Sequence, residues 1–146
     1  MSFMGDVLGG GQNQLDYQEG FIGMLLAIIA ADGHIDSNEV VDFHAAIKKT
    51  NLLKNLDPRL LSRKIENTIR ILNGQGLEGL VQESAKALTS ESLRKGTFAY
   101  ACDMVFSDGN VDPMEVRVMD RIKFLLQIDD QFAQEVGEVF KAKASV

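Results

Sequence analysis

Apolar residues recur every three or four positions along most of the chain from Leu15 onward, which predicts helices. The first predicted helix, from Leu15 to Ala31, has apolar residues at helical spacing, and we expect it to be largely buried. No segment alternates apolar and polar residues as a strand does. Further helices are expected to begin near Asp36, Asp57-Pro58, Leu77, Thr89 or Ser90, Asp112-Pro113, and Asp129 or Asp130. We therefore predict an all-α fold, a compact bundle of about seven helices.

The amphipathic helices indicate which side chains enter the core. After Asp36 the predicted apolar stripe is Val40, Val41, His44 and Ile47. After Pro113 the corresponding stripe is Val116, Met119, Ile122 and Leu126. Between them, the sequence Asn-Gly-Gln-Gly at 73–76 is expected to stop a helix, with a short helix following over Leu77–Leu88.

One acidic motif occurs twice, at residues 32–39 and 108–115, and both copies read Asp-Gly-x-(Ile/Val)-Asp-x-x-Glu. Each copy lies between a long apolar helix and an amphipathic one. This repeat predicts two related three-helix units, at about 15–73 and 90–143, joined by the short helix. Residues 15–146 are then a single domain, and residues 1–14, with three consecutive glycines, form a flexible N-terminal arm.

Most of the motif is explained by helix capping. Asp36 and Asp112 occupy N-cap positions, where a carboxylate accepts a hydrogen bond from a free backbone N–H. Glu39 and Glu115, three residues later, complete a capping box in each copy. The glycine of each copy suits the left-handed residue that ends a helix. Each N-cap is expected to contribute about 1 kcal/mol of stability.

Asp32 and Asp108 are not explained in this way. They fall at the carboxyl end of the preceding helix, where the helix dipole disfavours negative charge. Capping gives them no role, yet both copies carry the same unfavourable residue. We therefore expect them to serve a purpose other than helix punctuation.

That purpose is interpreted as binding of a divalent cation, Ca²⁺ or Mg²⁺, since these ions take several oxygen ligands. The motif matches the second half of an EF-hand loop, but the positions of the first acidic ligands hold Ile28 and Ala30, so an EF-hand is excluded. Binding is expected to be weak unless the two turns share one site. The candidate metal ligands are Asp32, Asp36, Glu39, Asp108, Asp112 and Glu115.

Composition narrows the function further. The chain has 146 residues and a net charge of −6, and no dense basic cluster is evident, which argues against nucleic-acid binding. Its single cysteine, Cys102, excludes an internal disulfide and fits a reducing, cytoplasmic setting; we expect it to be a buried small side chain. The longest apolar run, residues 21–31, is too short to span a membrane. No triad of catalytic residues stands out, so we expect no enzymatic activity and no cofactor besides the possible cation.

With the stretches at 30–39 and 107–115 in view, the sequence resembles the TerB-like family, which comprises the tellurite-resistance protein TerB and its relatives. The resemblance extends loosely over about Leu15 to Lys141. It implies an all-α fold of two related halves, a bacterial cytoplasmic location and a role in metal-linked stress response, including tellurite resistance. It also implies partners among other Ter proteins, one of them an integral membrane protein, near the inner membrane face. By resemblance, the same six carboxylates are the candidate cation ligands.

Two other interpretations remain open. In the first, the chain is a protein-interaction module whose acidic turns only cap helices and whose partner binds an apolar groove elsewhere. In the second, two of the six acids act as general acid and base of a hydrolase, which needs a deep pocket. The placement of the two turns in the folded chain discriminates among these.

Overall fold

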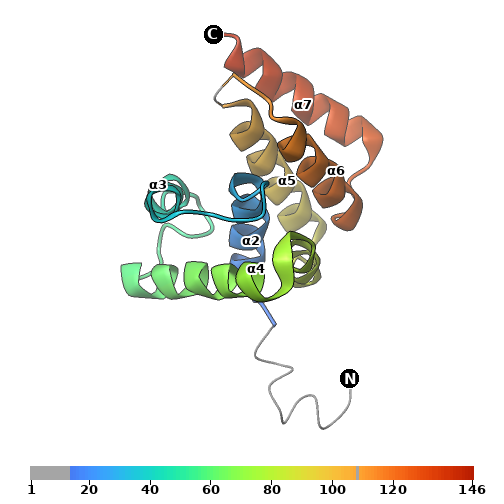
Figure 1. Cartoon of the computed structure of the whole chain (residues 1–146). Coiled ribbons are helices and arrows are strands. Elements are labelled where there is room, and N and C mark those ends of the chain that lie inside the picture. The colour runs from blue at the N-terminus through green and yellow to red at the C-terminus, as the bar shows by residue number, and fades with distance from the viewer. Residues whose placement is uncertain (1–13, 108) are drawn as a thin grey trace.

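A computed structural model describes residues 14–107 and 109–146; the rest of the predicted arm and Asp108 lie outside the described residues. The described part contains helices and no strand, which confirms the all-α prediction. In chain order (Figure 1) the helices are α2 (Tyr17–Ile29), α3 (Ser37–Ile47), α4 (Pro58–Ala87), α5 (Glu91–Phe106), α6 (Pro113–Leu125) and α7 (Asp130–Ala144).

Helix α4 contains a break at Gly76, whose φ of 77° and ψ of −177° are not helical. The break divides α4 into segments over 58–75 and 77–87. Glycine adopts this backbone conformation without the penalty that a Cβ imposes. The predicted helix stop and the short helix after it are therefore confirmed. Within the described ranges, no helix has a stretch both long and apolar enough to cross a membrane.

Helix α2 lies near the centre of the fold, as Figure 1 shows, whereas α7 lies at the outer edge, farther from α2. It packs against α3, α4, α5 and α6. Every position from Glu19 to Ile28 is buried, so the predicted burial of the first helix is confirmed. The core that surrounds it includes Phe43, Leu53, Leu80, Phe98 and Ile122.

The most extensive helix pair, α2 with α4, is closely packed through small residues. A Cβ added to Gly20 would lie 2.9 Å from the Cβ of Ala87 and 2.9 Å from the carbonyl oxygen of Ser84. At Gly23 the same addition would lie 2.1 Å from the Ser84 Oγ. Glycine is thus needed at Gly20 for close approach of two helices rather than for a turn.

Hydrogen bonds fix the start of α2 to α4, a feature that the sequence patterns did not predict. Asp16 and Glu19 form a capping box, with the Glu19 N–H donating to Asp16 Oδ1 over 2.8 Å. The buried Glu19 carboxylate accepts from the Asp16 N–H through Oε1, at 3.0 Å, and from Asn67 Nδ2 through Oε2, at 2.7 Å. Lys64 Nζ donates to Asp16 at 2.5 Å. The buried carboxylate is therefore hydrogen-bonded on both oxygens, as burial of a charge requires.

The second half repeats the order of the first, with α5, α6 and α7 in place of α2, α3 and the first segment of α4. Ser37 and Pro113, the first residues of α3 and α6, are 76 positions apart, which is the offset between the two motifs. Packing differs between the halves, however. Helix α7 contacts α5 and has no fully buried residue, and α3 lies to one side of α2 (Figure 1).

Two of the predicted core positions are wrong. In α3 the buried residues are Phe43 and Ile47, whereas Val41 is 66% exposed. In α6 Val118 and Ile122 are buried, whereas Val116 is 42% exposed. Both helices carry more apolar residues than one stripe accommodates. Periodicity therefore finds the helix but does not decide which side faces the core.

The single thiol gives a testable property. Cys102 is buried in α5, as predicted, and burial raises the pKa of its thiol from 9.0 to about 11. At pH 8 the thiolate, which is the reactive form, is then about 100-fold scarcer than for the ordinary thiol. We expect the native protein to react with a thiol reagent at least ~100-fold more slowly than the urea-unfolded chain. Rapid labelling of the native protein, absent in Cys102→Ala, would contradict this burial.

Candidate functional site: two acidic turns

The first acidic turn joins α2 to α3. Gly33 has a φ of 100°, and its N–H donates to the Ala30 carbonyl at 2.7 Å. Asp36 then caps α3: its Oδ1 accepts from the Glu39 N–H at 2.8 Å, and Glu39 Oε1 accepts from the Asp36 N–H at 3.2 Å. The predicted capping box is confirmed in this copy.

The second acidic turn, between α5 and α6, repeats this design. Gly109 has a φ of 77°, and its N–H donates to the Phe106 carbonyl at 3.2 Å. Asp112 Oδ1 accepts from the Met114 N–H at 2.7 Å, and Glu115 Oε1 accepts from the Asp112 N–H at 3.2 Å. The second capping box is confirmed as well. Two turns built alike therefore present their carboxylates in related positions.

Asp32 has a structural role that the sequence analysis did not give it. Its Oδ1 accepts from the His34 N–H at 3.2 Å, an Asx turn, and its Oδ2 lies 3.5 Å from His34 Nε2. This hydrogen bond shapes the connection between α2 and α3 but caps neither helix, since the C-cap of α2 is Ala30 and the N-cap of α3 is Asp36. The counterpart of Asp32, Asp108, lies outside the described residues.

The fold brings the two turns together. Asp32 and Glu39 from the first copy line the same open pocket as Asp112 and Glu115 from the second. Its volume is about 310 Å³, and its remaining walls are Ile28, Ile29, Ala31 and Met114. These residues come from the end of α2 and the start of α6, which pack against each other. Glu39 and Glu115, which are 76 positions apart in sequence, thus line the same pocket.

The position of each predicted ligand can now be stated. Asp32 and Asp112 are exposed, whereas Glu39 and Glu115 are half-buried at the pocket. Asp36 is exposed and is not among the residues that line the pocket. In the described ranges, which lack Asp108, no three Asp, Glu, His or Cys side chains are placed to hold one metal ion.

An apolar groove that the sequence did not predict adjoins this pocket. Ala31 and Met114 line both. The groove has a volume of about 390 Å³, and its other walls are Leu77, Glu78, Val81, Arg117, Val118 and Arg121. The hydrogen bond from the Arg121 guanidinium, 2.6 Å from Nε to Glu78 Oε1, lowers the pKa of Glu78. The groove lies between the segment 77–87 of α4 and helix α6. The sequence pattern does not predict that these two helices pack together.

The fold and the paired turns define a class of protein: a small all-helical domain of two related halves with an acidic pocket between them. The family model described as tellurite resistance protein TerB matches residues 18–137. The chain belongs to this TerB family, and the resemblance inferred from the motifs is confirmed. Comparison with curated proteins and with solved structures gives no match.

Proposed function

We propose that this TerB domain binds a divalent cation, Ca²⁺ or Mg²⁺, weakly in the pocket between its two acidic turns and has no catalytic activity. The observation that carries the proposal is the shared pocket, where Asp32 and Glu39 meet Asp112 and Glu115. Hard cations select oxygen ligands, and the four carboxylates that line this pocket would supply them once their side chains converge on the ion. The proposed set also includes Asp108, as a ligand by its place in the motif, and Asp36, which caps α3 and thereby positions Glu39.

Weak affinity follows from the state of these carboxylates. Glu39 and Glu115 each direct one oxygen to a backbone N–H, at 3.2 Å in both copies. A cation therefore has to use the second oxygens, displace a capping bond or retain water ligands. Exposed side chains also have to lose rotamer freedom as they converge. These costs place the expected dissociation constant at about 10⁻⁴–10⁻³ M.

The test is a titration of the protein with CaCl₂ and with MgCl₂, followed by amide shifts in ¹⁵N NMR spectra. We expect saturable shifts in residues 32–39 and 109–115. The decisive variant is Asp32→Asn/Asp112→Asn, which removes one charge from each turn. Asparagine keeps the oxygen that accepts the Asx-turn and N-cap hydrogen bonds. We expect at least ~tenfold weaker binding with little loss of stability.

The matched control is Asp57→Asn/Asp129→Asn. These aspartates cap α4 and α7, accepting from the Arg59 and Phe132 N–H groups, and they do not line the pocket. The control makes the same charge change at two helix N-caps, the kind of position that Asp112 occupies. If both double variants weaken cation binding equally, the effect comes from the overall charge of the protein and not from the pocket. The absence of shifts in either turn up to several millimolar cation would end the proposal.

A second candidate function is that of a protein-interaction module. It is favoured by the capping bonds, since the acidic side chains turn back onto backbone N–H groups, and by the apolar groove beside them. The cation titration separates the two candidates because this one predicts no response. Hydrolase chemistry is disfavoured, because the pocket is open and Asp32 and Asp112 are exposed, whereas an efficient general acid needs a pKa raised by burial.

Family membership extends the proposal to the biological setting. We expect this domain to act in the bacterial cytoplasm, in a metal-linked stress response that includes tellurite resistance. Its expected partners are other Ter proteins near the inner membrane face. The family description supports this setting through the words tellurite resistance.

A further inference from the structure

A basic pocket lies on the opposite end of α3 from the acidic turn. It is formed by the end of α3, the connection to α4 and the start of α4, and its volume is about 550 Å³. Lys48, Lys49 and Lys54 are exposed around it. Leu53 and Leu61 form a buried apolar floor. Half-buried His44 and Leu56 and exposed Pro58 complete its walls.

Positive charge is strongly concentrated here. The segment 48–64 contains six of the fifteen Lys and Arg residues but only one of the twenty-one acidic residues, Asp57. Lys64 is paired with Asp16. In the part of the chain that the structure describes, no ion pair involves Lys48, Lys49, Lys54, Arg59 or Arg63. The protein as a whole is acidic, with a net charge of −6, so a cationic surface at one end is a marked segregation of charge.

Local structure explains only part of this concentration. Lys48 and Lys49 follow the carboxyl end of α3, where the helix dipole favours cations. Lys54 lies in the connection between α3 and α4, away from the helix end where the dipole favours a cation. Arg59 lies in the first turn of α4, which has no acidic residue and where the dipole disfavours a cation. Like charges placed together repel, so a folding role does not account for them.

The basic pocket belongs to one half of the protein only. The connection from α3 to α4 covers residues 48–57, whereas that from α6 to α7 covers only 126–129. At the offset of 76, the positions of Lys48, Lys49 and Lys54 hold Phe124, Leu125 and Asp130. The pocket is therefore separate from the duplicated acidic design, and its ligand is not the cation proposed above.

We propose that the basic pocket docks a short acidic segment of a partner protein, with one apolar side chain of that segment on the Leu53–Leu61 floor. The charges fit carboxylates, and a charged rim around an apolar floor is the usual anatomy of a protein interface. The leucines lie at the bottom of a hollow, which a flat lipid surface does not fill. The three lysines are exposed to solvent. A small anion needs donors that are enclosed and converge on it, and these lysines do not provide them.

The test uses a fluorescein-labelled synthetic peptide of twelve residues, with Asp and Glu around two Leu, and a peptide in which Ser replaces both Leu. Fluorescence anisotropy is measured with the full chain at 50 and 300 mM NaCl, and amide shifts are mapped by ¹⁵N NMR. We expect the Leu peptide to bind more tightly than the Ser peptide, with affinity falling at high salt. Its shifts should map to residues 44–61.

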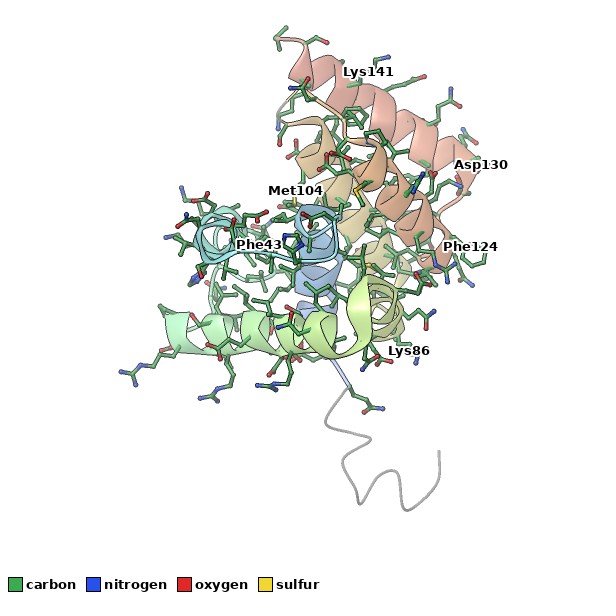
Figure 2. All side chains as sticks on the ribbon, in the orientation of Figure 1. Phe43, Lys86, Met104, Phe124, Asp130 and Lys141 are labelled. Atoms are coloured by element: carbon green, nitrogen blue, oxygen red, sulfur yellow. The ribbon has the colours of Figure 1, made fainter. Side chains whose placement is uncertain are left out.

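The variant Lys48→Gln/Lys49→Gln/Lys54→Gln is expected to bind the Leu peptide about tenfold more weakly. The matched control, Lys86→Gln/Lys141→Gln/Lys143→Gln, removes the same charge elsewhere; Figure 2 shows Lys86 and Lys141 on other helices, well away from α3. It should bind within about twofold of the unchanged protein. Equal affinity for both peptides, shifts outside residues 44–61, or equal weakening by the control would overturn the proposal. So would binding to phosphatidylglycerol vesicles, or to inorganic phosphate, without binding to the Leu peptide.

Discussion

Phe43→Ala is expected to lower the free energy of unfolding by about 3–5 kcal/mol, the largest effect of a single substitution considered for this protein. Phe43 is 1% exposed and, with Ile47, is one of the two buried side chains that α3 contributes to the core. Alanine there leaves a cavity as well as losing the transfer free energy of the ring. Urea denaturation at 25 °C measures the change.

Phe124→Ala is the matched control, because it deletes the same ring from a surface position. Phe124 is 70% exposed, and the Arg121 guanidinium lies 5.3 Å from its ring centroid. Figure 2 shows Phe43 on α3, toward α2, and Phe124 at the outer edge of the molecule, at the end of α6. We expect the control to cost less than about 1 kcal/mol. Similar losses in both variants would show that α3 is not anchored through Phe43.

Gly20→Ala is expected to destabilise the protein by about 1–3 kcal/mol, although alanine is the better helix former. The reason is the closeness of α2 to α4: the added methyl group would lie 2.9 Å from both the Ser84 carbonyl oxygen and the Ala87 Cβ. Backbone cannot rotate away as a flexible side chain can, so the two helices have to separate. The measurement is the same denaturation experiment.

Gly96→Ala provides the control of opposite sign. Gly96 lies within α5, and a Cβ there would have no neighbouring atom within 4 Å. Alanine should therefore stabilise the protein by about 0.5–1 kcal/mol through its higher helix propensity. If both glycine variants change stability in the same direction, the packing of α2 on α4 is not the cause.

Local features of this fold were predictable because short-range physics determines them. The spacing of aspartate and glutamate in the motif predicted both capping boxes, at Asp36 and at Asp112. The break at Gly76 followed from a sequence rich in glycine. What failed was orientation: Val41 and Val116 were expected inside and are exposed. Which side of an amphipathic helix faces inward depends on the neighbours that tertiary packing supplies.

The candidate sites were predictable in part for the same reason. The sequence indicated which acidic side chains belong together but not that the end of α2 packs against the start of α6, so that Asp32 and Asp112 line one pocket. The basic pocket was missed because its residues divide between a connection and two helices. Charge segregation over 48–64 is visible in the sequence and was the available signal.

The central position of α2 has a consequence for synthesis of the chain. Helix α2 is the first described helix to leave the ribosome, whereas α5, which covers one of its sides, ends at Phe106. At roughly 5–20 residues per second, synthesis of α5 is complete about 4–15 s after that of α2. During this interval the nascent chain carries the exposed apolar surface that chaperones recognise. The side of α2 that α5 covers thus stays exposed until the second half has been made, whereas α4, its most extensive partner, is complete at Ala87.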